Sequence, residues 1–535
     1  MTGPRTVREA AFDVLRRTGM TTIFGNPGST EIPLLTGLPD DLAFVLGLHE
    51  GAVVGMATGW AIARERPAPA LLHTTAGLGN AVGALATARV NRAPLVVLVG
   101  QQDRRHLALE PFLAGRLDGL AGEYPVWTAQ PARAADLPGL IARAYHEAWT
   151  HRGPALVVAP MNDWTEPYDA PEVAAPERVV RPTPVLDEDV AGLMASLLEA
   201  RAPALVVGAR AATAETWAAL VEIAEKLNCP VWQESFGARA GFPQDHPLFA
   251  GFLPSGRAGL RRALAPYDVV VAVGAPVFRQ YGYEPGPLTE PGTALAVVTD
   301  DPDEAHRSPV ALALLASPAA VCARLAALLP GPRTRPAPRP PLPPLAPGPG
   351  EPLRAAHVLR ALADRLPADA ILIEETPSSR PDLHRLVPAR TPLGFVSAAM
   401  GGLGFALPAA IGLRMAEPDR PVVAVTGDGA ALYGIQSLWS AAHYRIGALF
   451  VVLSNGRYAV MDRLAESGGA GKAPWPPFTE VSMHTLAAGL GCPARRVTAY
   501  EELVAVLDEV IPALAARETP LLLDVAVTPD GTFTP

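Results

Sequence analysis

The chain has 535 residues, which is too long for one hydrophobic core and predicts about three domains. Hydrophobic residues make up 49% of the chain and charged residues 18%, which excludes an intrinsically disordered protein. The formal net charge of −9 argues against a general nucleic-acid binder, because such proteins neutralise phosphates with an excess of basic residues.

The cysteines and the apolar runs indicate the cellular compartment of the protein. Cys229, Cys322 and Cys492 lie far apart and form no CxxC pair, so neither a disulfide framework nor a zinc site is predicted. The N-terminus lacks the apolar core of a signal peptide, and no apolar run approaches the ~20 residues that a membrane helix needs. We therefore expect a cytoplasmic protein that is not inserted in a membrane.

Two proline-rich stretches predict the domain boundaries. Residues 330–352 read PGPRTRPAPRPPLPPLAPGPGEP, which predicts an extended, semi-rigid linker. A weaker break, rich in proline and charge, lies at 165–189. The predicted domains are therefore residues 1–165, 185–330 and 351–535.

Each predicted domain alternates short apolar runs with helical patterns. The runs are APALLH and APLVVLVG in the first, PALVVG and YDVVVAVGAP in the second, and RPVVAVTGDG, GALFVVLSNG and TPLLLDVAV in the third. Valine-rich runs without polar alternation are typical of strands that are buried on both faces of a parallel sheet. The pattern predicts an α/β protein with three consecutive doubly wound parallel-sheet domains, whose sites lie at the carboxyl ends of strands.

Three strand-end loops of the first domain carry polar residues. Ser29 lies in the turn FGNPGST, Glu50 opens an apolar helical stretch, and His73 precedes a glycine-rich turn. Each alone is explained by structure: a helix cap, a first-turn charge and a buried histidine. Together they place a hydroxyl, a carboxylate and an imidazole at one edge of a sheet, which predicts a catalytic site.

The third domain carries a metal and phosphate pattern. Asp428 lies between Gly427 and Gly429 directly after one predicted strand, and Asn455 follows the next strand. A carboxylate and an amide oxygen, completed by carbonyl and phosphate oxygens, suit Mg²⁺. The glycines let the main chain approach a diphosphate closely. We therefore predict a magnesium and diphosphate site.

These motifs, together with VGAPVFRQYGYEPG and AAMGGLGFALPAAIG, resemble the family of thiamine diphosphate-dependent 2-oxo acid decarboxylases, and within it the benzoylformate decarboxylases. The resemblance covers nearly the whole chain. It implies a pyrimidine-binding, a central and a diphosphate-binding domain, in that order, with thiamine diphosphate and Mg²⁺ as cofactors. It also implies a homodimer or homotetramer with active sites between subunits.

The resemblance implies roles for individual residues at the cofactor. Glu50 would hydrogen-bond the cofactor's pyrimidine, and Leu403 would support its two rings. Asp428, Asn455 and the main-chain carbonyl of Arg457 would hold Mg²⁺. In the loop EETPSS, the residues expected near the diphosphate are Thr376 and Ser378, with Pro377 at a position where the family has a hydroxyl.

The resemblance also implies a substrate pocket. Ser29 and His73 match the substrate-facing residues, whereas Tyr281 stands where the family has a second histidine. Ser397 and Leu464 align with aromatic residues that pack the substrate's ring. The leading prediction is non-oxidative decarboxylation of a benzoylformate-like 2-oxo acid to an aldehyde.

Three other functions remain open at this point. A carboligase or aldehyde lyase acting on 2-hydroxy ketones would use the same cofactor and is favoured by the missing second histidine. A flavin or nicotinamide oxidoreductase would fit the α/β pattern, but the glycine-rich stretches at 77–83 and 401–408 lack the surroundings of a dinucleotide fingerprint. A non-catalytic homologue is disfavoured, because Glu50, Asp428 and Asn455 are all present.

Overall fold

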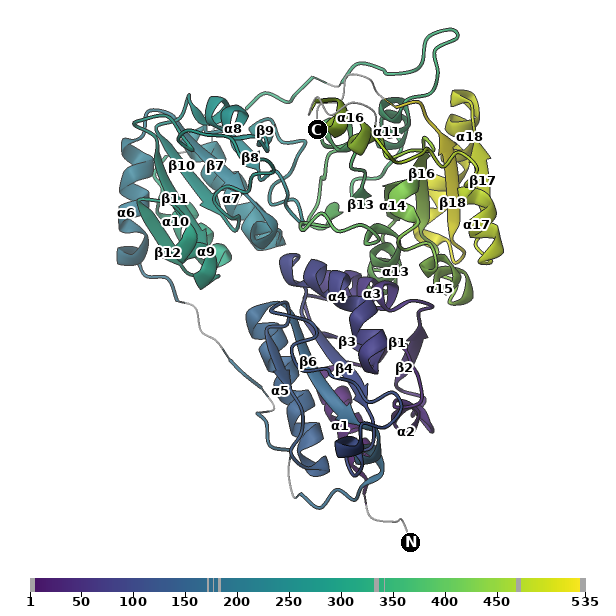
Figure 1. Cartoon of the computed structure of the whole chain (residues 1–535). Coiled ribbons are helices and arrows are strands. Elements are labelled where there is room, and N and C mark those ends of the chain that lie inside the picture. The colour runs from purple at the N-terminus through teal and green to yellow at the C-terminus, as the bar shows by residue number, and fades with distance from the viewer. Residues whose placement is uncertain are drawn as a thin grey trace.

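The computed structural model describes residues 5–170, 173–176, 178–180, 184–331, 336–340, 342–467 and 473–529, and in them three sheets follow one another along the chain (Figure 1). Each sheet has six strands, and every strand pairing within these sheets is parallel. Helices flank both faces of each sheet. The predicted fold class is confirmed.

The first sheet has the strand order β2-β1-β3-β4-β6-β5. Its strands are β1 (Thr22–Asn26), β2 (Ala43–Leu46), β3 (Ala68–His73), β4 (Leu95–Gln101), β5 (Trp127–Ala129) and β6 (Pro154–Pro160). Its helices are α1 (Val7–Thr18), α2 (Ile32–Leu35), α3 (Glu50–Arg64), α4 (Thr74–Val90) and α5 (Leu137–His151). Every residue of β4 and β6 is buried, which explains why these strands read as unbroken apolar runs.

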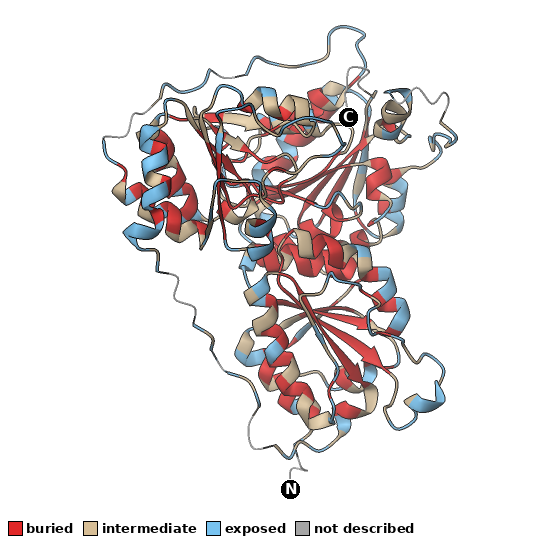
Figure 2. Cartoon of the chain, turned by 60° about the vertical axis from the view of Figure 1, so that its left-hand side comes forward, coloured by how far each residue is buried: buried red, intermediate tan, exposed pale blue. Residues whose placement is uncertain are grey.

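The second sheet has the strand order β12-β11-β10-β7-β8-β9. Its strands are β7 (Pro203–Val207), β8 (Val231–Gln233), β9 (Phe249–Phe252), β10 (Val269–Val273), β11 (Ala294–Thr299) and β12 (Leu312–Leu315). Its helices are α6 (Asp187–Glu199), α7 (Ala214–Leu227), α8 (Arg257–Leu264), α9 (Pro302–Arg307) and α10 (Pro318–Leu328). Buried residues, red in Figure 2, make up most of its central strands β7 and β10 and parts of its flanking helices.

The third sheet has the strand order β14-β13-β15-β16-β18-β17. Its strands are β13 (Ile371–Glu375), β14 (Phe395–Ser397), β15 (Val422–Gly427), β16 (Leu449–Ser454), β17 (Ala494–Val497) and β18 (Leu521–Ala526). Its helices are α11 (Ala355–Ala363), α12 (Arg380–Leu386), α13 (Ala406–Ala416), α14 (Asp428–Ala431), α15 (Ser437–His443), α16 (Ala459–Ser467), α17 (Met483–Gly489) and α18 (Tyr500–Val510). The central strands β15 and β16 are neighbours, so their carboxyl ends lie side by side.

Helices α3 and α13 join the first and third sheets into one hydrophobic core. Their backbones approach so closely that a Cβ atom added to Gly59 would lie 2.1 Å from the carbonyl oxygen of Ala409. A Cβ added to Gly412 would lie 1.9 Å from the carbonyl oxygen of Met56. Glycine is therefore required at both positions, because any larger residue would push the helices apart.

The linker and the domain limits stay predictions. The described residues of 330–352 form no helix or strand, whereas 332–335 and 341 lie outside the described residues. So do parts of the predicted break at 165–189 and both chain ends. Within the described ranges, no helix combines the length and hydropathy needed to span a membrane.

Candidate active site

The loops after β15 and β16 form one wall of a cavity of about 1030 Å³. Asp428 begins α14 directly after β15, and Asn455 follows β16. The Asp428 carboxylate accepts hydrogen bonds from the main-chain N–H groups of Gly429 (2.8 Å), Asn455 (2.8 Å) and Gly456 (2.6 Å). Gly456 has a φ of +68°, a left-handed conformation that suits glycine. The two strand ends are thus held together by one carboxylate.

The surroundings of Asp428 suit a cation. Burial raises the pKa of this carboxyl group, the three main-chain amides lower it, and the charge of Asp524 raises it further. Its described hydrogen bonds all come from main-chain amides. A divalent cation beside it would offset the cost of burying its charge. The oxygen atoms of Asp428 and Asn455 on the cavity wall are hard ligands of the kind that Mg²⁺ prefers.

The remaining predicted metal and diphosphate residues also line this cavity. They are Thr376, Ser378, Gly427, Gly429 and Arg457. Gly427 has open space where a side chain would begin, whereas a Cβ on Gly429 would lie 2.6 Å from the ring of Tyr458. The Arg457 side chain pairs with Asp462 at 2.9 Å. The hydroxyl oxygen of Ser378 accepts a hydrogen bond from the N–H of Val460 (3.0 Å), which ties this loop to α16.

Leu403 projects into the cavity from the loop that precedes α13. This loop is held by Glu375, whose carboxylate accepts hydrogen bonds from the N–H groups of Gly404 (2.6 Å), Phe405 (2.9 Å) and Ala406 (2.6 Å). Burial raises the pKa of Glu375 to about 7, although these amides lower it. Sequence reasoning missed Glu375, although the adjacent carboxylates in EETPSS at a strand end were a usable signal.

The three residues predicted to replace the family's substrate-pocket residues lie in different places. Tyr281 lines the cavity but is 67% exposed, with its ring centroid 6.5 Å from that of Phe236. Leu464 lines the cavity from α16. Ser397 is buried behind the wall, where its hydroxyl group donates to Glu374 (2.8 Å).

Glu50 lies at the first turn of α3, where two asparagines orient it. The side-chain amide of Asn26 donates to one carboxylate oxygen (3.0 Å), and that of Asn80 donates to the other (3.1 Å). Glu50 is buried in this arrangement. Sequence reasoning missed both asparagines, although they stand in the motifs FGNPGS and LHTTAGLGN.

His73 ends β3 and is held by a second carboxylate. Its Nδ1 atom lies 2.9 Å from an oxygen of Glu31 and 3.0 Å from the hydroxyl of Thr30. Because Glu31 can only accept when ionised, this contact places a proton on Nδ1 and leaves Nε2 for other partners. A Cβ on Gly28 would lie 2.5 Å from the His73 ring, so the glycine allows the neighbouring loop with exposed Ser29 to pass close by.

The structure therefore divides the predicted site into two groups. Apart from Ser397, the predicted residues of the third domain line one cavity together with Tyr281 and other residues of the second domain, whereas Ser29, Glu50 and His73 do not line it. These three belong to the carboxyl edge of the first sheet. Within the described residues of a single chain, the two groups do not form one pocket.

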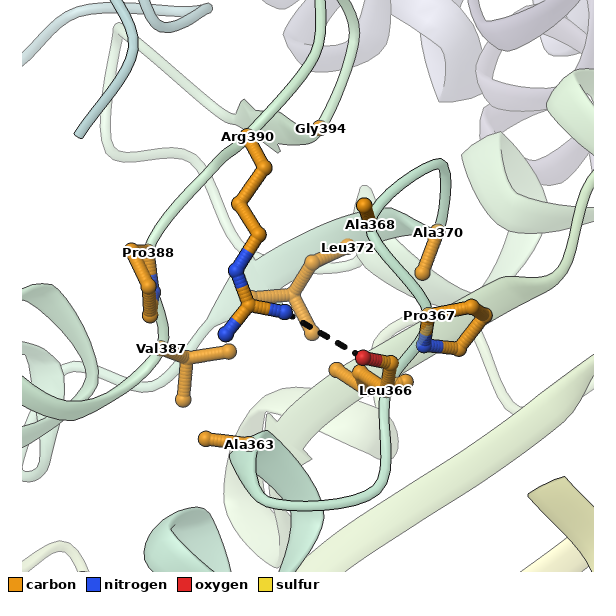
Figure 3. Close-up of a pocket in the computed structure, with 10 residues that line it drawn as sticks. All are labelled: Ala363, Leu366, Pro367, Ala368, Ala370, Leu372, Val387, Pro388, Arg390 and Gly394. Atoms are coloured by element: carbon orange, nitrogen blue, oxygen red, sulfur yellow. Dashed lines mark hydrogen bonds between the residues drawn. The ribbon is translucent and has the colours of Figure 1, made fainter. Parts of the chain in front are cut away.

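A smaller cavity of about 200 Å³ shares Ser378, Asn455 and Arg457 with the larger one. A small hollow beside β13 measures about 10 Å³ and is crossed by a hydrogen bond from Arg390 to the carbonyl of Leu366 (3.3 Å; Figure 3). That volume suits one water molecule at most. No cluster of three or more His, Cys, Asp or Glu side chains in the described ranges could hold a metal.

Three family models match successive parts of the chain. Residues 5–121, 190–325 and 378–525 match, respectively, the N-terminal TPP binding, central and C-terminal TPP binding domains of the thiamine pyrophosphate enzymes. The chain is 39% identical to benzoylformate decarboxylase of Pseudomonas aeruginosa, over 97% of this chain and 98% of that protein.

Two solved structures are similar over nearly their whole length. One is the thiamine diphosphate-dependent 4-hydroxybenzoylformate decarboxylase of Rhodococcus jostii, with a TM-score of 0.93 and 35% identity over 99% of this chain and 100% of that one. The other is benzoylformate decarboxylase of Polynucleobacter necessarius, with a TM-score of 0.92 and 32% identity over 99% of this chain and 100% of that one.

Proposed function

Because this chain belongs to the thiamine pyrophosphate enzyme family, with all three of its domains, we propose that it decarboxylates a benzoylformate-like 2-oxo acid to an aldehyde, without oxidation. Thiamine pyrophosphate is another name for thiamine diphosphate. The observation that carries the proposal is the pair of strand-end groups, one built around Glu50 and the other around Asp428 and Asn455.

The donor set in the third domain fits the cofactor. Asp428, Asn455 and the carbonyl of Arg457 would hold Mg²⁺, and the open space at Gly427 would admit a diphosphate group close to the main chain. Ser378 can donate its hydroxyl proton to a phosphate oxygen, because its own oxygen already accepts from Val460. When bound, thiamine diphosphate supplies a nucleophilic carbon and an electron sink for the decarboxylation.

The chain's own side chains would bind the substrate and move protons. Glu50, oriented by Asn26 and Asn80, would hold a proton at the cofactor's pyrimidine ring. Nε2 of His73, left available by the contact of Nδ1 with Glu31, would exchange a proton with the reacting groups. The hydroxyl group of Ser29 would bind the substrate's carboxylate.

We propose that a second copy of the chain completes each active site, so that the minimal unit is a homodimer and a homotetramer can form from two of them. The edge of the first sheet supports this proposal, since the loop after β4 exposes Leu109 (81%) and Phe112 (88%) on a single chain. Exposed apolar side chains beside a polar cluster are typical of a protein interface. The occupant we propose is the cavity face of the partner's third domain.

The substrate proposal is an aryl- or alkyl-substituted 2-oxo acid. The relatives named above act, by their names, on benzoylformate or 4-hydroxybenzoylformate. The rings of Phe236 and Tyr281 on the cavity wall provide aromatic surface for an acyl group, while Leu464 provides an aliphatic one. The cavity is large enough for a cofactor and an aryl substrate together.

One observation favours a second function, carbon–carbon ligation with an aldehyde acceptor. Tyr281 occupies the position predicted for the family's second histidine, and it lies at the exposed rim of the cavity. A phenol keeps its proton at neutral pH and so transfers protons poorly. Slower proton transfer would delay release of the aldehyde product and so favour ligation with an added aldehyde.

A panel of 2-oxo acids, with thiamine diphosphate and Mg²⁺ each added or omitted, tests the proposal. Carbon dioxide release that requires both cofactors and no aldehyde supports decarboxylation, whereas product formed only with an added aldehyde supports ligation. No turnover of any 2-oxo acid in the fully supplemented reaction would contradict both.

Co-expression of Glu50→Gln and Asp428→Asn chains with different tags tests the shared site. In mixed dimers one site carries both changes and the other carries neither, so purified mixed dimers should regain about half of the wild-type turnover per dimer. If each site were built within one chain, the mixed dimers would stay as inactive as either variant alone.

A further inference from the structure

Strand β13 ends in two adjacent buried carboxylates, Glu374 and Glu375, just before the loop expected at the diphosphate. Successive residues of a strand point to opposite faces, so the two groups serve different loops. Glu375 holds the loop that carries Leu403. Glu374 faces the other way, toward the loop 376–380 and the end of β14.

Glu374 gathers four hydrogen bonds from three residues. One carboxylate oxygen accepts from the main-chain N–H of Thr376 (2.6 Å), from the Thr376 hydroxyl (2.9 Å) and from Nε of Arg380 (3.2 Å). The other oxygen accepts from the Ser397 hydroxyl (2.8 Å). Burial alone would raise the pKa of Glu374, but the charge of Arg380, helped by nearby His384 and by these bonds, lowers it to about 2.

This network replaces a main-chain donor that the loop lacks. Pro377 has no N–H group, so the loop cannot be held through that residue. The Thr376 hydroxyl is directed to Glu374, and the oxygen of Ser378 accepts from Val460. The Ser378 proton therefore stays available for a phosphate, and the neighbouring Ser379 also lines the cavity.

We propose that Glu374 is a positioning residue that sets the loop 376–380 for the diphosphate, and that Ser397 acts through Glu374 instead of forming a wall against the substrate. The inference rests on the proposed function, because it assumes thiamine diphosphate at this cavity. Ser397 is 4% exposed, and the residues that line the cavity do not include it. A phenylalanine at this position would remove a donor from Glu374 and crowd its carboxylate.

The first test compares thiamine diphosphate binding by the full-length wild type, Glu374→Gln and Asp382→Asn, by calorimetry at saturating Mg²⁺. Asp382 is the control, because it lies on helix α12 with Arg380 but pairs with the exposed Arg385 instead of holding the loop. We expect Glu374→Gln to weaken binding roughly tenfold, because Arg380 loses its charged partner and Thr376 loses a charged acceptor. Asp382→Asn should stay within about twofold of the wild type.

Ser397→Ala and Ser397→Phe separate the two roles of Ser397. Acting through Glu374, Ser397→Ala should weaken thiamine diphosphate binding by about three- to fivefold and leave the KM for the 2-oxo acid unchanged. Ser397→Phe should weaken cofactor binding more strongly than Ser397→Ala. A change in the KM for the 2-oxo acid with unaltered cofactor affinity would overturn the inference and place Ser397 at the substrate.

Thermal unfolding without the cofactor distinguishes positioning from simple structural support. If Glu374→Gln lowers the unfolding temperature but binds thiamine diphosphate like the wild type, the inference is overturned and the proposed function stands. If the wild type itself fails to bind thiamine diphosphate with Mg²⁺, the proposed function falls and the inference falls with it. If Glu374→Gln does not fold, the comparison of Ser397→Ala with Ser397→Phe tests the inference by itself.

Discussion

The first and third domains share one architecture but prepare their functional edges differently. In the third domain the loops after β13, β15 and β16 enclose a cavity, and buried carboxylates hold each loop in place. In the first domain Glu50 and His73 are also hydrogen-bonded, yet they line no part of that cavity, and apolar side chains of the loop after β4 are exposed. One edge lines a cavity within the chain, and we propose that a second copy of the chain completes the other.

This difference supports the proposal that the first and third domains supply two halves of one site between chains. The loops that follow the strands of a parallel sheet lie at the same edge, whatever residues they contain. The chemistry of each domain's edge therefore depends on which residues follow its strands. In the proposed site, the third domain would supply oxygen ligands and glycines for a metal and a diphosphate. The first supplies a carboxylate and an imidazole whose partners fix their orientation. The predictions below change the third-domain site, the first-domain site and then the contact between helices α3 and α13.

The largest effect is expected from Asp428→Asn, which removes the charge of the third-domain cradle but keeps the side chain's shape. We expect Mg²⁺-dependent turnover to fall by about a thousandfold or more, because the carboxylate that offsets the cation's charge is lost. Steady-state carbon dioxide release across a Mg²⁺ titration measures the loss. A variant that keeps wild-type turnover at the same Mg²⁺ concentration would contradict the assigned metal site.

Glu50→Gln tests the proposed role of the first domain in proton transfer. We expect kcat to fall by roughly a hundred- to ten-thousandfold, because the amide cannot exchange a proton with the cofactor. Thiamine diphosphate affinity should change much less, since the cradle of the third domain is untouched. Parallel measurement of kcat and of cofactor binding checks both expectations, and full turnover by this variant would refute the role of Glu50.

Gly59→Ala in α3 tests the packing of α3 against α13, which connects the first and third domains. Its new Cβ would collide with the carbonyl of Ala409 in α13, so we expect a loss of stability of roughly 1–3 kcal/mol and a thermal midpoint lower by a few degrees. Gly192→Ala in α6 is the control, because nothing lies within 4 Å of the added carbon. That change should raise stability slightly, by about 0.5–1 kcal/mol. Equal midpoints for the two variants would show that α3 and α13 are not tightly packed.

The last prediction concerns acid stability, which should depend on the third domain. Burial lowers the pKa of His384 to about 3 from an ordinary value of 6.5, although the charge of Glu374 raises it. The ring stacks on Phe252 with centroids 3.5 Å apart. The unfolded chain therefore binds a proton that the folded chain does not, and stability present above pH 6.5 should be lost as the pH falls toward 3.

Thermal midpoints of the full-length protein from pH 7 to pH 4 test this expectation. His384→Phe should show a smaller decline than the wild type, because it removes the group that gains a proton on unfolding. His106→Phe, which replaces an exposed histidine of the first domain, should decline like the wild type. If His384→Phe and the wild type decline equally, the acid lability arises elsewhere.

Local patterns in the sequence were enough to predict the fold class and to place Asp428 and Asn455 at strand ends. The unbroken apolar runs identified buried parallel strands, and the residues that follow β15 and β16 were expected side by side before any coordinates were considered. Motifs such as GDG are short, and they stand at strand ends, so neighbouring strands bring them together whatever the rest of the chain does. The assignment to the thiamine-dependent enzymes followed from the same motifs and is confirmed by the comparisons.

Other features depended on contacts between residues far apart in the chain. Asn91 of the first domain bonds the carbonyl of Ser397 (3.0 Å) and the N–H of Ala399 (2.9 Å), which no local pattern predicts. The family resemblance predicted that Ser397 faces the substrate, whereas in the structure its hydroxyl group donates a hydrogen bond to Glu374.

What the sequence by itself determined was therefore the order of strands and loops and the chemistry each strand end carries, because backbone periodicity and turn residues act over a few positions. Only the tertiary structure decided which of those ends share a cavity, which side chains lie behind its wall and how closely α3 and α13 approach. Those outcomes depend on the packing of whole elements, where a shift of a few ångströms redirects a side chain from the cavity to the core.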